Sequence, residues 1–205
     1  MVYLPQHFAE TDEATLVAFM REHSFGTLIT SGSAGLIASH IPFLFDAVPG
    51  TPGRLLGHLA RANPQLADLA DGREALVIFH GPHAYISPRW YATSPAVPTW
   101  NYAVVHAYGK VEAIADAAAL EALVGRLADT YEAGAEKPWR LADQPERYVK
   151  GMLRGIGGFA IELTRLQGKF KLSQNRDATD RAQVTAELAR SDDPVAAAVA
   201  AMMAR

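Results

Sequence analysis

The sequence predicts a mainly β protein, an antiparallel sheet or barrel with helices at its periphery. Three observations predict this fold class. The expected strands follow one another along the chain with hairpin signals between them, and the expected helices come as excursions between strands. With 49% hydrophobic and 20% charged residues over 205 positions, the chain can also bury a sizeable core. An antiparallel architecture is therefore favoured over a doubly wound parallel sheet.

The first third of the chain is expected to contain a helix, three strands and a second, short helix. Their expected bounds are 12–23, 27–30, 36–45, 54–58 and 64–69. Asp12 stands where an N-cap belongs, before Leu16 and Phe19 at helical spacing. The segment Ser31–Gly35 is a hairpin signal between the first two strands. Pro64 suits the first turn of the short helix.

The rest of the chain is expected to hold four more strands and four helical stretches. The strands are 75–79, 84–87, 102–114 and 159–166, and the helical stretches are 116–132, 145–154 and two within 179–205, separated by 191–194. The strand from Tyr102 to Ile114 alternates between two faces. The helix from Asp116 to Glu132 carries one apolar stripe. That stripe consists of Leu120, Leu123, Val124, Leu127 and Tyr131.

Composition excludes several classes of function. The absence of cysteine excludes disulfides, thiolate catalysis, iron–sulfur clusters and zinc–thiolate sites. An isoelectric point near 6.2 argues against a chain-wide basic surface for nucleic acid. The first seven residues lack the features of a signal peptide, and the longest apolar run, Val195–Ala204, is too short to span a bilayer. We expect a cytoplasmic protein without a membrane partner.

Charge is distributed unevenly along the chain. From Ala75 to Val111 there is no acidic residue, whereas residues 112–146 carry eight acids against three bases. Residues 151–176 carry five bases and one acid. Such segments are commonly solvated surface, but the basic and acid-free segments can also meet around an anionic ligand.

The segment His58–Pro64 lies where a strand is expected to pass into a helix. Free N–H groups at a helix start suit a phosphate, and Arg61 and His58 can add donors. In the alternative interpretation, Asn63 simply caps the helix.

Aromatic residues gather in two neighbouring segments, His80–Tyr91 and Val97–Tyr102. Together these segments contain two Trp, three Tyr and two His. Such side chains can stack on a planar ring while Thr99 or Asn101 reads its heteroatoms; they also suit a subunit interface.

A third segment, Gly168–Arg176, is basic. In an extended conformation Lys169, Lys171 and Ser173 share one side, which suits a phosphate or carboxylate; the alternative is a solvated basic loop. The histidines form no helical His-x-x-x-His pair, so a structural metal is not expected. A single histidine could still serve as an axial haem ligand.

At these segments the sequence resembles the PaiB family, the FMN-binding negative transcriptional regulators also called protease synthase and sporulation negative regulators. The resemblance runs in order from residue 1 to about 188. The motifs that carry it are Tyr3–Phe8, His40–Phe43, His58–Pro64, Ser87–Tyr91, Pro98–Tyr102 and Gly168–Arg176.

The resemblance implies a split β-barrel related to pyridoxamine-phosphate oxidases, forming a homodimer with FMN at the subunit interface. We expect the split barrel to span residues 1–176 and a helical tail to span 177–205. The predicted flavin-binding residues are His58, Arg61, Asn63, Thr99, Trp100, Asn101, Tyr102, Lys169, Lys171 and Gln174. Of these, His58, Arg61 and Asn63, with Lys169 or Lys171, are expected to hold the phosphate.

The function implied by the resemblance is that of a flavin-binding transcriptional regulator. A flavin-dependent oxidoreductase acting on a small molecule and a haem-binding barrel are alternatives, and no catalytic constellation is evident. Because the chain is net negative and its most helical region is acidic, we predict weak, strongly salt-dependent DNA binding at most. The clustered Trp90, Tyr91, Trp100 and Tyr102 predict an obligate homodimer that buries well over about 2,000 Å² in total.

Overall fold

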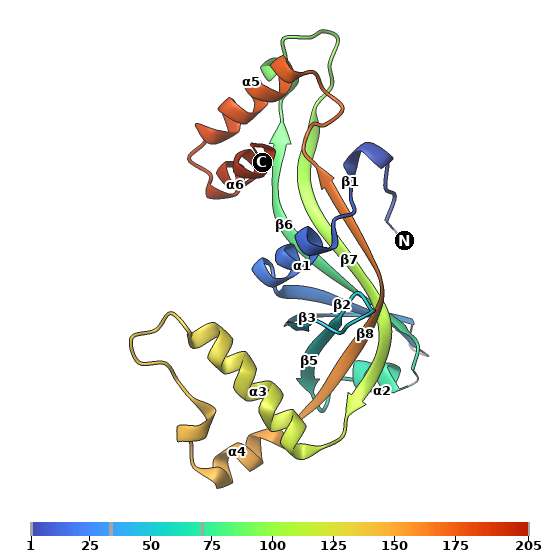
Figure 1. The fold of residues 1–205 in the computed structure, drawn as a ribbon, viewed down its shortest axis with the longest axis vertical. Helices are drawn as coiled ribbons and strands as arrows, with labels where there is room; N and C mark the ends of the chain where they lie inside the picture. The colour runs from blue at the N-terminus through green and yellow to red at the C-terminus, as the bar shows by residue number, and fades with distance from the viewer. Residues whose placement is uncertain (1, 33–34, 71, 205) are drawn as a thin grey trace. The chain divides into compact units, whose positions relative to one another are not determined.

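The computed structural model describes residues 2–32, 35–70 and 72–204, and its central element is an eight-stranded sheet (Figure 1). The strand order is β3-β2-β6-β7-β8-β5-β4, with β1 paired to β8. The strands are β1 (Ala9–Glu10), β2 (Phe25–Gly32), β3 (Gly35–Pro42), β4 (Leu44–Asp46), β5 (Arg54–Ala60), β6 (Glu74–Ile86), β7 (Thr99–Ile114) and β8 (Ile156–Lys171). The pairs β1–β8, β2–β3, β2–β6, β4–β5 and β5–β8 are antiparallel.

Six α-helices accompany the sheet in the described chain. They are α1 (Glu13–Glu22), α2 (Gln65–Ala70), α3 (Ala117–Glu132), α4 (Glu146–Leu153), α5 (Ala178–Ala189) and α6 (Pro194–Met203). Short 3₁₀ turns cover Gln6–Phe8, Pro88–Trp90 and Leu141–Asp143. The predicted fold class, mainly antiparallel β with peripheral helices, is confirmed.

Three local predictions about the strands were wrong. The segment 36–45 forms two strands, β3 and β4, which are separated at Phe43. The segments 75–79 and 84–87 are one strand, β6, because Gly81-Pro82 does not interrupt it. In the described chain β2 pairs with β6 only at Leu76–Ile78, so Pro82 lies beyond that pairing, where its missing N–H costs no bond to β2. Strand β8 is also longer than expected and includes both Lys169 and Lys171. The predicted 31–35 hairpin pairs Gly32 with Gly35, while Ser33 and Ala34 lie outside the described residues.

The chain divides into two compact units, and β6, β7 and β8 contribute residues to both. Unit 1 contains residues 2–19, 79–106 and 167–204, and unit 2 contains 20–32, 35–70, 72–78 and 107–166. The expected boundary at residue 176 stays a prediction.

Unit 2 is built around the apolar stripe of α3. Leu120, Leu123 and Leu127 are buried, and the last two join one apolar cluster. That cluster contains Leu44, Leu56, Leu123, Leu127 and Ala160. The Asp116 carboxylate caps α3 by accepting from the Ala119 N–H at 2.9 Å, as its position in the sequence predicts. Tyr131, the last residue of the predicted stripe, is exposed and not buried. Its hydroxyl lies 2.7 Å from the Ser24 hydroxyl.

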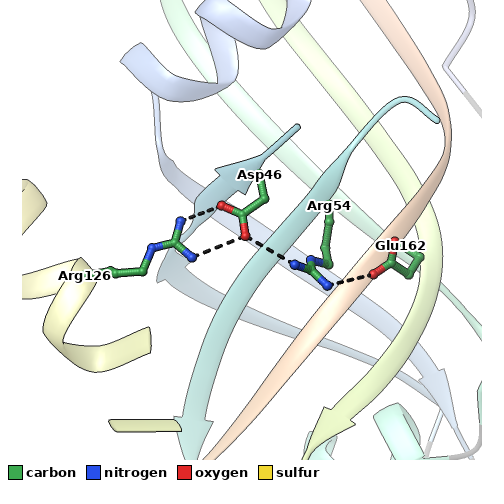
Figure 2. Close-up of polar contacts among 4 residues, drawn as sticks. All are labelled: Asp46, Arg54, Arg126 and Glu162. Atoms are coloured by element: carbon green, nitrogen blue, oxygen red, sulfur yellow. Dashed lines mark hydrogen bonds and ion pairs between the residues drawn. The ribbon is translucent and has the colours of Figure 1, made fainter. Parts of the chain in front are cut away.

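A row of charged side chains ties α3 to neighbouring strands in unit 2 (Figure 2). Arg126 of α3 meets the Asp46 carboxylate with two N–H···O contacts of 2.5 and 3.2 Å. Asp46 also accepts from Arg54 at 3.4 Å, and Arg54 continues to Glu162 at 3.5 Å. The hydrogen bond from Arg126 is the main cause that lowers the pKa of Asp46.

Unit 1 packs α1 and the two C-terminal helices against its strands. The rings of Phe19 and Phe170 lie 5.1 Å apart. A Cβ at Gly81 would stand 2.6 Å from the Phe19 ring, so this position needs glycine for close approach. Helix α5 is anchored by the buried Asp180, which accepts from the Thr93 hydroxyl at 2.6 Å and from the Ala92 N–H at 2.7 Å.

Candidate functional site

The ten predicted flavin-binding residues fall in both units. Three of them, at positions 58, 61 and 63, belong to unit 2. The other seven, at positions 99–102, 169, 171 and 174, belong to unit 1, where β7 and β8 carry six of them. The two groups are described separately.

The ammonium groups of Lys169 and Lys171 are held by oxygen atoms of unit 1. Lys171 Nζ donates to Thr99 Oγ1 at 2.7 Å and to the Trp100 carbonyl oxygen at 2.6 Å. Lys169 Nζ donates to the Tyr3 carbonyl oxygen at 2.8 Å. An ammonium has three N–H groups, so these bonds leave two donors on Lys169 and one on Lys171. The structure thus brings Thr99, Trp100 and Lys171 together, as predicted.

Neither lysine forms an ion pair with a carboxylate of the described chain. Lys169 is only 8% exposed, although lysines are almost never fully buried unless they are paired. Burial is the main cause that lowers the pKa of Lys171, and the positive charges of Lys169 and Arg176 lower it further. The end of β8 and the turn after it therefore concentrate positive charge that no ion pair with an acid of the described chain offsets.

Three aromatic rings and one imidazole lie near this lysine pair. Lys169 Nζ lies 5.3 Å from the Tyr3 ring centroid and 5.6 Å from that of Tyr102, distances typical of cation–π contacts. Lys171 Nζ lies 5.6 Å from the Phe8 ring centroid. The pKa of His106 is lowered mainly by burial, and also by the neighbouring charge of Lys169. We name Lys169, Lys171, Tyr3 and Tyr102 the lysine site.

Asn101 and Gln174 are engaged inside unit 1. Asn101 is completely buried and donates to Ser173 Oγ at 2.9 Å. Gln174 accepts from the Leu172 N–H at 2.7 Å and donates to the Phe170 carbonyl oxygen, so its amide shapes the turn after β8. Ser173 was expected on the same side as the lysines; it instead follows the end of β8 with a φ of 65° and is buried against Asn101.

In unit 2, His58 lies on β5 opposite Gly158 of β8. Its Nδ1 atom is buried and has no hydrogen-bond partner in the described chain. Burial lowers the pKa of the imidazole, so the ring is neutral at neutral pH. A neutral ring adds no charge with which to hold a phosphate.

Arg61 and Asn63 have local structural partners. The Arg61 guanidinium donates through Nε to the Arg154 carbonyl oxygen at 2.8 Å and through Nη2 to the Ile156 carbonyl oxygen at 2.6 Å. Asn63 accepts from the Gln65 N–H at 2.9 Å, which is the capping alternative weighed for this segment. The contacts of both side chains support a structural role. The helix that follows them, α2, is only six residues long. A part for Arg61 and Asn63 in phosphate binding stays a prediction.

Sequence reasoning missed Tyr3 and Phe8 as site residues. Both reach the lysine site because β1 pairs with β8, with Ala9 opposite Lys169. This pairing joins positions 160 residues apart, and a two-residue strand carries no periodicity that reveals it. The available signal was the position of both aromatics within the first motif of the family resemblance.

Two further properties complete the description of the site. Within residues 2–32, 35–70 and 72–204, no group of three or more His, Asp or Glu side chains is arranged to hold a metal ion. None of the helices in the described chain has the length and apolar character needed to cross a membrane.

Comparison with known families identifies the kind of domain. Residues 2–165 match the family model described as "Putative FMN-binding domain". The chain belongs to this family. It is also 36% identical over 202 residues to "Protease synthase and sporulation protein PAI 2" of Bacillus subtilis (strain 168), covering 98% of this chain and 96% of that protein. The resemblance to the PaiB family is therefore confirmed.

Solved structures share the fold at low sequence identity. The flavocytochrome Anf3 from Azotobacter vinelandii superposes with a TM-score of 0.61 at 14% identity, covering 85% of this chain and 75% of that one. The FAD and heme binding protein from Mycobacterium smegmatis gives a TM-score of 0.59 at 17% identity, covering 85% and 78%. The split-barrel fold class is thus confirmed.

Proposed function

We propose that this chain binds FMN and holds the flavin phosphate on Lys169 and Lys171. The observation that carries the proposal is the burial of Lys169 without a carboxylate partner in the described chain. A phosphate dianion supplies the missing negative charge, and the three unused N–H donors of the pair can bind its oxygens. Membership in an FMN-binding domain family supports this choice of anion.

The aromatic rings of the lysine site suit the rest of the cofactor. Tyr3 and Tyr102 flank Lys169, and the Tyr3 ring is 83% exposed. An exposed aromatic face beside an anion site favours a ligand that combines a phosphate with a planar ring system. Bound FMN would supply electron or hydride transfer at its isoalloxazine ring.

We further propose that the protein is a homodimer. We also propose that it regulates transcription through its bound flavin and does not bind DNA tightly itself. Large apolar side chains are exposed to solvent in the single chain: Leu36 is 79% exposed and Phe25 is 66% exposed. Such exposure supports a subunit interface that buries them.

The basic segment of residues 151–176 is poorly suited to DNA phosphates. Lys169 is buried, and Arg165 stacks 3.8 Å from the centroid of the Tyr108 ring. Arg176 stacks 4.2 Å from the centroid of the Tyr91 ring. Because these contacts occupy basic side chains that DNA phosphates would need, they favour regulation through the bound flavin over direct DNA binding.

Titration of the purified chain with FMN, followed by flavin fluorescence, tests the proposal. Lys169→Met and Lys171→Met should each weaken binding, whereas Lys110→Met, which removes an exposed lysine on β7, should not. Absence of FMN binding to the folded chain, or equal binding by all three variants, would overturn it. An absorbance spectrum with a Soret band and no flavin bands would favour the haem alternative.

A further inference from the structure

Unit 1 contains a cavity of about 630 Å³ whose lining includes neither Lys169 nor Lys171, the residues proposed to hold the flavin phosphate. It shares only Trp100 with the ten residues predicted for the flavin. Its lining comes from β6, the 3₁₀ turn Pro88–Trp90 and β7, and from the end of α5 and the start of α6. The helical wall lies beyond residue 165, where the match to the family model ends. A volume of this size accommodates a small organic molecule.

The part of the lining that comes from β6, the 3₁₀ turn and β7 is aromatic. It consists of His83, Tyr85, Trp90 and Trp100, with Ala84 between the first two. The Tyr85 and Trp100 rings meet edge to face with centroids 6.0 Å apart, and they are 47% and 52% exposed. Aromatic surface left in solvent along a concave wall favours a planar or cationic group that can lie against the ring faces.

The helical wall supplies the only acidic groups that line the cavity in the described chain. Glu187 is paired with Arg190 at 2.6 Å, so these two charges offset one another. Asp193 caps α6 through one oxygen, which accepts from the Val195 N–H at 2.9 Å, and it has no basic partner in the described chain. The cavity therefore carries one uncompensated carboxylate opposite a wall of π-systems.

We propose that this cavity binds a planar aromatic ligand that carries one positive charge. The ring would lie against Trp100 and Tyr85, where stacking and edge contacts are available. The cationic group would be attracted by the aromatic faces and by Asp193. The acid-free lysine site has the opposite polarity, so the two sites select different ligands. This inference is independent of FMN binding.

The test follows the indole N–H signals of the full-length protein labelled with ¹⁵N-tryptophan. The chain has three tryptophans, of which Trp90 and Trp100 line the cavity and Trp139 belongs to unit 2. Single Trp→Phe variants assign the signals. Titration with benzyltrimethylammonium should move the Trp90 and Trp100 signals and leave that of Trp139 in place. Benzyl alcohol should bind at least about tenfold more weakly, and benzenesulfonate should cause no shift.

A matched pair of variants separates charge from folding. Asp193→Asn keeps a capping side chain but removes the charge, so it should weaken benzyltrimethylammonium binding by roughly three- to tenfold and leave benzyl alcohol unchanged. Asp192→Asn removes a neighbouring charge that does not line the cavity and should change neither. Equal affinity for the three probes, equal loss in both variants, or a Trp139 shift as large as the others would overturn the proposal.

Discussion

Replacing Lys171 with methionine tests which of two predicted groups of residues binds the flavin phosphate. One is the lysine site; the other is the helix-start group, His58, Arg61 and Asn63. Methionine keeps most of the length of the side chain and removes its charge. In the proposed complex, the variant loses one charge-assisted hydrogen bond to the phosphate, worth about 1.5–3 kcal/mol. FMN affinity should therefore fall by roughly 10- to 150-fold.

Without FMN the same substitution should change stability little. It relieves a half-buried charge that Lys169 and Arg176 repel, but it also removes the donor to Thr99 Oγ1 and to the Trp100 carbonyl oxygen. These effects oppose one another, and we expect a net change within about 1 kcal/mol. Thermal unfolding with and without FMN measures both quantities in one series, because a bound ligand raises the melting temperature.

The pH dependence has a defined sign. Burial lowers the pKa of Lys171 from its usual 10.5, and only the protonated ammonium attracts phosphate. FMN affinity should therefore be highest at neutral pH and decline on the alkaline side, beginning below pH 10.5. Lys171→Met should remove that decline.

Arg61→Met is the matched comparison. The helix-start hypothesis expects this variant to lose FMN affinity by a similar factor. In the structure, however, the guanidinium holds two carbonyl oxygens, so we expect a loss of stability with FMN affinity nearly intact. If Arg61→Met abolishes FMN binding while Lys171→Met binds normally, the lysine site is the wrong choice and the helix-start group holds the phosphate.

Four further predictions concern stability, packing, assembly and DNA binding. Asp46→Asn should lower the free energy of unfolding by about 1 kcal/mol at neutral pH in urea titrations. Because folding lowers the pKa of Asp46 below 3.8, this difference should shrink as the pH falls through the lowered value; a difference that persists in acid would contradict the assignment. Gly81→Ala should cost about 1–3 kcal/mol, since the new methyl group meets the Phe19 ring, and Phe19→Leu should restore part of the loss in a double-mutant cycle. Light scattering should give twice the 22.1 kDa of one chain, and gel shifts at physiological salt should show no nanomolar sequence-specific DNA complex; a stable monomer or such a complex would refute these proposals.

Local signals predicted the helices well. Asp12 and Asp116 begin α1 and α3 as capping residues, and the Leu120–Leu127 stripe is the face that α3 buries. Pro194, which was expected in the segment that separates the two tail helices, is instead the first residue of α6, a position that its fixed backbone angle suits. These elements were predictable because capping and helical periodicity depend on residues within one or two turns.

The site was only partly predictable, because its geometry depends on long-range pairing. Charge and spacing identified Lys169 and Lys171, but their neighbour Tyr3 comes from the far end of the sequence. The sequence predicted that Asn101 binds a ligand. In the structure its side-chain amide instead donates to the hydroxyl of Ser173, which the turn after β8 brings next to it. Sequence pattern shows which side chains could bind; the fold decides which are still available to do so.

The burial of Lys169 also has a consequence for the protein in the cell. If the flavin phosphate binds Lys169 as proposed, FMN binds the folded chain and not the unfolded one, and it therefore stabilises the fold by mass action. Chain synthesised during riboflavin shortage should be cleared faster by proteases than chain that meets its cofactor on release from the ribosome. The amount of protein would then report the flavin supply, without any change in transcription of its own gene.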